Sequence, residues 1–262
     1  WLGTIDNAFR FDAQENHFLP VKQEAADSAN AQVHVYFDFA EDSQGLLWAA
    51  SFQYGLLVFD ESRDLFRQAD MDSTDRRRLV QDIVTHITID SNDNIWVLTS
   101  NHVFKYKPHE KQLQHMFAFD QAPEWPNYVF GGLHEDRYGA IWVVQDQRGL
   151  YRFSADSQSF EEITFGGVQQ SGFEENMLSS IEMDAFGNMW MGSATNGLFK
   201  YDPARRPFRL YRHDPDHNNS LSTNRIYALA QSITNPNEIY VGTENGGWNA
   251  FNHSSNKARR FQ

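Results

Sequence analysis

The chain has 262 residues and a mass of 30.3 kDa, enough for one large domain or two small ones. With 22 basic against 35 acidic residues its formal net charge is −13, so nucleic acid and other polyanions are disfavoured as partners. The absence of cysteine excludes disulfides and thiolate metal sites, and no apolar run reaches the roughly 18 residues needed to cross a bilayer.

One sequence pattern recurs along the chain at a nearly constant spacing. It is Asp-x-x-Gly-x-x-Trp, followed by Gly-Leu and then an aromatic residue. The equivalent aromatic positions are Trp1, Trp48, Trp96, Trp142, Trp190 and Tyr240. Intervals of 46 to 50 residues match the length of one four-stranded propeller blade. The sequence therefore predicts an all-β fold, a β-propeller of four-stranded antiparallel blades.

The first blade begins at its second strand, with Trp1-Leu2-Gly3-Thr4, and so lacks its inner strand. The expected blades are residues 1–31 (partial), 32–81, 82–126, 127–174, 175–222 and 223–262, within a single propeller domain or an excerpt of one. A closed ring normally completes such a split blade with a strand from the other chain end. We therefore expect about six blades from a seven-bladed ring, with a complete open six-bladed form as the alternative.

The fourth repeat shows the expected strands most clearly, at residues 128–136, 140–145, 149–154 and 159–165. Between the first two, Asp136 can accept turn amide bonds and Gly139 can supply a positive φ, which predicts a tight hairpin. In the third repeat Asp93 replaces the glycine, and aspartate tolerates the left-handed region. The sixth blade has Pro236 in this turn and is expected to be distorted.

The strand tryptophans are expected to be structural rather than functional. Each precedes small or β-branched residues, such as Met191-Gly192 after Trp190, as suits a large ring packed between neighbouring sheets. The motif is therefore assigned to turns and to packing between blades.

The motif residues also carry a resemblance to a known family. Residues 135–142 (Glu-Asp-Arg-Tyr-Gly-Ala-Ile-Trp) with residues 149–153 (Gly-Leu-Tyr-Arg-Phe) resemble the two-component regulator propeller repeat, as does the stretch from His213-Asp214-Pro215 to Ile226. The resemblance covers nearly the whole chain. It implies the periplasmic sensor part of a membrane receptor, often a hybrid histidine kinase and sometimes a diguanylate cyclase. One departure is His102, which stands where the third blade should have the glycine of its third strand.

One face of the propeller is the better candidate for binding. The connections between blades share that face with the hairpins joining second and third strands, and its loops are long and varied. The loops include residues 69–82 with Arg76-Arg77-Arg78, which we expect to be a solvated loop, together with 119–127 and 212–224.

Ligand-binding residues are predicted from the polar and aromatic positions on that face, because sugars suit amides and carboxylates beside stacked rings. Inner strands begin at His34, Asp82, Tyr128, Asn176 and Asn224, and hairpin tips carry Tyr54, Arg148, Asn196 and Asn245. Trp125 stands between two prolines that stiffen its presentation. The predicted ligand contacts are His34, Tyr54, Trp125, Tyr128, Arg148, Asn176, Asn196, Asn224 and Asn245.

No catalytic residue, cofactor or metal site is predicted. Residues 214–220 alternate like a calcium loop, but Asn219 stands where glycine is needed and Arg225 where glutamate should close the site. His86 and His134 are expected to be strand residues satisfied by backbone groups, because no second histidine follows at a metal-binding spacing.

The leading functional hypothesis is a non-catalytic, periplasmic ligand-sensing domain of a transmembrane receptor of the two-component type. It would bind an oligosaccharide or similar small ligand, would form a homodimer through the full-length receptor, and would meet the membrane only through segments outside this chain. The alternatives are a propeller enzyme, either a polysaccharide hydrolase or a lyase, and a protein-interaction scaffold. An enzyme would need converging carboxylates or a histidine-based acid–base pair.

Overall fold

The fold is that of a computed structural model, which describes residues 1–4, 7–23, 35–119, 131–145, 148–154, 156–163, 178–202 and 209–261. The chain separates into two compact units, Trp1–Asn127 and Tyr128–Gln262, and each is described by itself. Within the described ranges, no helix has the length and apolar character that crossing a membrane requires.

The first unit consists of three successive antiparallel groups of strands and one helix. They are β1 (Leu2–Gly3), β2 (Ala8–Asp12) and β3 (His17–Gln23); β4 (Tyr36–Glu41), β5 (Leu47–Ser51), β6 (Gly55–Asp60) and β7 (Leu65–Gln68); and α1 (Ser73–Gln81), β8 (Val84–Ile89), β9 (Ile95–Thr99), β10 (His102–Lys107) and β11 (Gln112–Ala118). The first group has three strands and each later group has four, in agreement with the predicted fold of four-stranded antiparallel blades.

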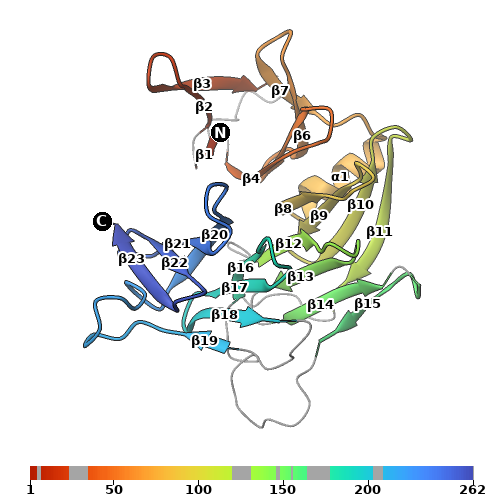
Figure 1. The fold of residues 1–262 in the computed structure, drawn as a ribbon. Helices are drawn as coiled ribbons and strands as arrows, with labels where there is room; N and C mark the ends of the chain where they lie inside the picture. The colour runs from red at the N-terminus through yellow and green to blue at the C-terminus, as the bar shows by residue number, and fades with distance from the viewer. Residues whose placement is uncertain are drawn as a thin grey trace. The chain divides into compact units, whose positions relative to one another are not determined.

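The second unit contains three four-stranded antiparallel sheets (Figure 1). They are β12 (Gly131–Glu135), β13 (Ile141–Gln145), β14 (Gly149–Ser154) and β15 (Ser159–Glu162); β16 (Leu178–Met183), β17 (Met189–Ser193), β18 (Gly197–Tyr201) and β19 (Arg209–Tyr211); and β20 (Ile226–Gln231), β21 (Glu238–Thr243), β22 (Trp248–Asn252) and β23 (Lys257–Phe261). Within each of these three sheets the strands are paired in chain order, as in propeller blades.

The incomplete first blade is joined to the second by a parallel contact that the sequence does not predict. Lys22 of β3 pairs with Leu65 of β7, and Gln23 pairs with Phe66. Figure 1 shows β3 beside β7, so the two blades form one seven-stranded sheet. The repeat period and the turn residues define each hairpin. They do not show which outer strands of neighbouring blades pair with each other.

The Asp-to-Trp motif forms the same turn in four blades. In the fifth blade, Asp184 accepts hydrogen bonds from the backbone N–H groups of Phe186 and Asn188, and its second oxygen accepts from Trp190 Nε1 at 2.9 Å. The equivalent indole bonds join Trp48 to Asp42, Trp96 to Asp90 and Trp142 to Asp136. One carboxylate thus closes the hairpin and orients the following ring.

The backbone of these turns follows the sequence expectation. The residue three positions after the turn aspartate has a positive φ. It is Gly45 (81°), Gly139 (79°) or Gly187 (79°), and in the third blade Asp93 (58°). Aspartate therefore occupies the left-handed region where the repeat normally has glycine. In the sixth blade the Asp is replaced by Ser232, whose hydroxyl bonds to Tyr240 Oη at 3.0 Å, and the hairpin is longer.

Apolar clusters lie between neighbouring blades within each unit. The cluster between the second and third blades includes Trp48, Leu56, Ile87 and Phe104. The cluster between the fifth and sixth includes Trp190, Ile226 and Phe251. The tryptophans of blades two to five are 0–5% exposed, which supports their structural assignment.

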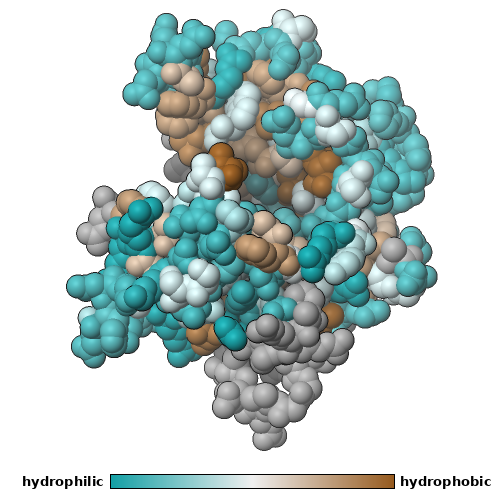
Figure 2. Space-filling view, viewed as in Figure 1, coloured by the Kyte–Doolittle hydropathy of each residue, from teal (hydrophilic) through white to brown (hydrophobic). Residues whose placement is uncertain are grey.

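The first blade is less buried. Its exposed large apolar side chains are Trp1, Leu2, Phe11 and Phe18, and Figure 2 shows brown apolar surface in this part of the first unit. Trp1 is 41% exposed even though its ring lies 4.9 Å from that of Phe59. The first blade therefore leaves several of its apolar side chains accessible to solvent.

Replacing Gly192 with alanine is expected to destabilise the second unit by about 1–3 kcal/mol, because the new methyl group overfills the contact between two blades. Its Cβ would lie 2.5 Å from Ser180 Oγ and 2.6 Å from Ile226 Cγ2. The matched control is Gly242→Ala at the same position of the sixth blade, where the nearest atom is Ala228 Cβ at 3.3 Å. Urea unfolding measures both; equal losses would contradict the packing argument.

Candidate functional site

The segment between the second and third blades contains a helix, so the expectation of a solvated loop at residues 69–82 is wrong. Asp72 caps α1 by accepting from the N–H groups of Thr74 and Asp75 at 2.8 and 2.9 Å. Leu79 is 1% exposed and joins the core between the two blades. The helix has only nine residues, too few for a clear amphipathic pattern, and it is stabilised by its cap and by this packing.

The arginines of α1 are partly engaged with the protein. Arg78 pairs with Asp75 at 3.1 Å, and Arg76 Nη2 donates to the carbonyl of Met71 at 3.4 Å. Arg76 Nε is buried without a hydrogen-bond partner among the described residues.

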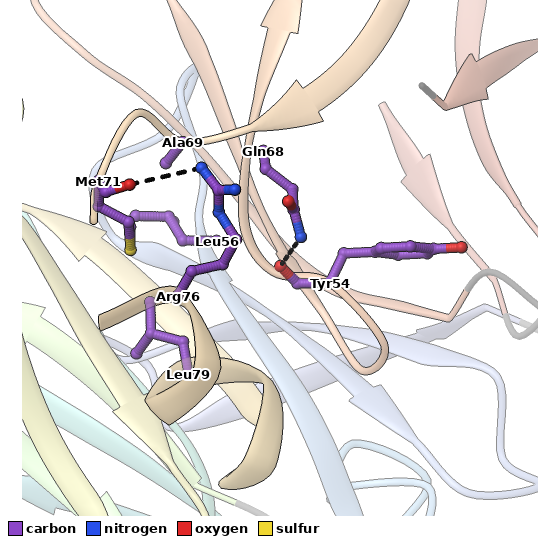
Figure 3. A pocket seen from close by; sticks show the side chains of 7 residues that line it. All are labelled: Tyr54, Leu56, Gln68, Ala69, Met71, Arg76 and Leu79. Atoms are coloured by element: carbon purple, nitrogen blue, oxygen red, sulfur yellow. Dashed lines mark hydrogen bonds between the residues drawn. The ribbon is translucent and has the colours of Figure 1, made fainter. Parts of the chain in front are cut away.

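A crevice lies where α1 meets β6 and the end of β7 (Figure 3). Its lining residues are Tyr54, Leu56, Gln68, Ala69, Met71, Arg76 and Leu79. Gln68 Nε2 donates to the Tyr54 carbonyl at 3.5 Å, whereas the Tyr54 ring points away from the crevice. No part of the crevice is wide enough for a water molecule. It is a packed seam that holds the helix rather than a ligand pocket.

The described members of the predicted ligand set mostly support their own loops. Asn196 Oδ1 accepts from Arg212 Nη2 at 3.1 Å, and Asn224 Oδ1 accepts from the His213 N–H at 2.7 Å. Arg148 Nη1 donates to Gln145 Oε1 at 3.2 Å. Asn245 has a φ of 57°, as a turn residue does.

Tyr54 is only 6% exposed and packs in the core between the first two blades, so its ring offers little surface to a ligand. The remaining predicted contacts, His34, Trp125, Tyr128 and Asn176, lie outside the described residues.

A polar cluster at the loop end of the third blade has the most developed geometry. Asp82 Oδ2 lies 2.6 Å from His102 Nδ1, and Asp82 Oδ1 accepts from Asn101 Nδ2 at 2.5 Å. The Thr99 hydroxyl also donates to Asp82. The His102 side chain is 36% exposed, against 13% for Asp82. A shielded carboxylate therefore holds an imidazole that solvent can reach.

Two residues of this cluster, Asp82 and His102, already stand out in the sequence. Asp82 is expected at the start of an inner strand, and His102 departs from the glycine of the repeat. A side chain that replaces a glycine on the predicted binding face is the signal that could link the two residues. Neither residue is in the predicted ligand set, because the repeat does not show that the two positions meet.

The loop that resembles a calcium site is held by internal bonds. Asp214 accepts from the Asp216 N–H at 2.9 Å and lies 2.8 Å from His217 Nδ1. Arg260 Nη2 donates to Ser220 Oγ at 2.8 Å, which attaches the loop to β23. Among the described residues, no group of three or more His, Asp or Glu side chains could hold a metal ion.

Two carboxylates on inner strands bind the free backbone edge of the next blade. Asp38 on β4 accepts from the Ile87 N–H of β8 at 3.0 Å. Glu182 on β16 accepts from the Gln231 N–H of β20. Burial raises the pKa of Asp38 to about 6 and that of Glu182 to about 7, although the backbone donors oppose the shift.

The pKa values of the histidines on inner strands are lowered, in contrast to those of the two carboxyls. Burial lowers the pKa of His86 to about 4, and burial also lowers the pKa of His134 while Asp136 opposes it. His86 Nδ1 is buried with no hydrogen-bond partner among the described residues, so the expectation that backbone groups satisfy this ring does not hold for that atom. Both rings are therefore neutral at pH 7.

Comparison with known proteins identifies the fold. No protein-family model matches the sequence, and no curated protein sequence matches it. The extracellular domain of a putative hybrid two-component system from B. thetaiotaomicron has a TM-score of 0.71 at 19% identity, over 100% of this chain and 33% of that one. PorZ, a surface component of the type-IX secretion system of Porphyromonas gingivalis, has a TM-score of 0.67 at 16% identity, over 95% and 36%.

An enzyme is also among the similar structures. Virginiamycin B lyase from Staphylococcus aureus has a TM-score of 0.63 at 11% identity, over 87% of this chain and 69% of the lyase. The present chain spans only about a third of the length of the first two proteins. At these identities the likenesses establish the β-propeller fold, as the repeat predicts.

Proposed function

We propose that this chain belongs to the two-component regulator propeller family and is a non-catalytic, ligand-sensing part of a transmembrane receptor, located in the periplasm. The observation that carries the proposal is the fold match over the whole chain to the extracellular domain of a putative hybrid two-component system. The repeat motifs at residues 135–142 and 149–153 support it independently. A kinase or cyclase output module and a receptor homodimer are part of the proposal.

The ligand that we propose is an oligosaccharide or a similar hydroxyl-rich molecule bound on the loop face. In the described blades the motif residues are used in turns and cores, so specificity falls to loops that differ from blade to blade. The proposed contacts are those predicted from the sequence, with Arg148, Asn196, Asn224 and Asn245 as the described members that are not buried. A sensor also requires that the ligand bind two receptor states with different affinity.

Glycan-array screening followed by isothermal titration calorimetry tests this proposal on the full extracytoplasmic region. We expect one class of oligosaccharide to bind, and Arg148→Ala to weaken it by about tenfold or more, as the loss of a charge-assisted hydrogen bond does. The matched control is Arg63→Ala, an exposed arginine in the β6–β7 turn, on the opposite face of a propeller blade. Absence of glycan binding, or equal effects of the two variants, would count against the proposal.

An enzyme is the second candidate, favoured by the Asp82–His102 pair, which has the arrangement of an acid–base dyad. Mass spectrometry of each bound glycan after incubation detects a cleaved product if this candidate is correct. Loss of that product in His102→Ala would assign the activity to this pair. Binding without cleavage leaves the sensor as the better description.

A further inference from the structure

Two histidines lie side by side on one face of the third blade. His102 begins β10 and His115 lies in β11, and their ring centroids are 5.2 Å apart at an interplanar angle of 70°. A bulge shifts the pairing so that Phe104 lies opposite His115 while His102 pairs with Ala118. Both imidazoles contact the buried Phe104 ring, at 5.6 and 5.4 Å. The bulge thus brings His115 toward His102 above an apolar base.

Asp82 determines which nitrogen of His102 is available to a ligand. In the neutral imidazole, the 2.6 Å contact to a carboxylate places the proton on Nδ1 and the lone pair on Nε2. Nε2 has no hydrogen-bond partner among the described residues, and the ring is 36% exposed. A carboxylate that fixes the tautomer in this way is the usual outer-shell partner of a metal-binding histidine.

The surroundings of the second imidazole include a nearby cation and a backbone hydrogen bond. Burial, the neighbouring His102 and Arg78 of α1 all lower the pKa of His115 below its ordinary value, and a backbone bond to Phe117 opposes them only weakly. Arg78 pairs with Asp75, so its charge near the site is partly compensated.

We propose that His102 and His115 together bind one divalent ion of the late first-row class, with Zn²⁺ as the best fit, and that Asp82 orients His102 from the outer shell. With metal–nitrogen distances of about 2.0–2.1 Å and a tetrahedral angle, the centroids of two ligating rings lie about 5–6 Å apart. The observed 5.2 Å agrees with this separation. No third ligand of the His, Asp or Glu type is present in the described part of the chain, so water or a ligand would complete the coordination.

Calorimetric titration of the untagged protein with zinc chloride, in a buffer that does not chelate zinc, tests this proposal. We expect one ion per chain at pH 7.5 and loss of this site in both His102→Ala and His115→Ala. Asp82→Asn is expected to weaken binding by about 10–100-fold while the site remains, as an outer-shell change does.

The matched control is His217→Ala. His217 has the same carboxylate pairing, with Asp214, but its ring packs against no second imidazole among the described residues. This variant should bind zinc like the wild type. His115 is exposed, so His115→Ala should keep the wild-type melting temperature without zinc, which excludes unfolding as a cause. Binding that survives His102→Ala or His115→Ala, or the absence of any one-site binding, would overturn the proposal without affecting the sensor hypothesis.

Discussion

Replacing Trp190 with alanine is expected to lower the free energy of unfolding of the second unit by about 3–5 kcal/mol, as large buried aromatics do. The ring is fully buried, contacts Tyr211 and Phe251, and belongs to the cluster between the fifth and sixth blades. The substitution also removes the Nε1 donor of Asp184, a carboxylate that is itself 4% exposed. The cavity and the loss of a hydrogen-bond donor to a buried carboxylate therefore both lower the free energy of unfolding.

Guanidinium unfolding followed by circular dichroism measures this loss. Trp248→Ala is the matched control, because that ring is 43% exposed and stacks on Phe261 at 3.9 Å. Its expected loss is about 1–1.5 kcal/mol, in keeping with one aromatic pair near the surface. Equal losses of unfolding free energy in the two variants would show that the motif tryptophan stabilises the fold no more than an exposed one.

A second large effect is expected from pH and from Glu182. Burial raises the pKa of this carboxyl from 4.5 in the unfolded chain to about 7 in the fold, so the folded state binds the proton more tightly. The unfolding free energy contributed by this group therefore rises as pH falls from about 7 to 4.5. At 1.4 kcal/mol per pH unit, the change over this window is roughly 3 kcal/mol.

Glu182→Gln removes this titration while keeping an oxygen acceptor for the Gln231 N–H. The variant should be more stable than the wild type at pH 8, and the difference should vanish near pH 4.5. Urea unfolding at several pH values measures it, with the exposed Glu161→Gln as the control. Asp38 keeps part of the pH dependence in both proteins, because its pKa is also raised. A stability difference that did not change with pH would refute the assignment.

The elements predicted best from the sequence are those whose geometry is local. The aspartate-closed hairpins needed only a turn acceptor and a residue tolerant of positive φ, and even Asp93 adopts the expected backbone. Helix α1 differs from the sequence expectation because its nine residues depend on the Asp72 cap and on the burial of Leu79. Propensity alone carries no information on either contact.

The candidate sites depended on contacts between strands that a repeat cannot predict. Tyr54 occupies a hairpin tip, where exposure is the ordinary expectation, yet the neighbouring blade buries its ring. His102 and His115 lie on the two strands of one hairpin and meet through the register of β10 and β11 and its bulge. The sequence shows the chemistry of each side chain. Which side chains lie next to one another depends on how the strands pair.

The shared setting of the four motif indoles has a spectroscopic consequence. Trp48, Trp96, Trp142 and Trp190 each donate to an aspartate in the same geometry, and the last three also have a cationic side chain over the ring. Their indole N–H groups therefore start from the same kind of hydrogen bond in different blades. Keeping one of them at a time would turn each blade into its own reporter, so that the order in which the blades open could be followed along the chain.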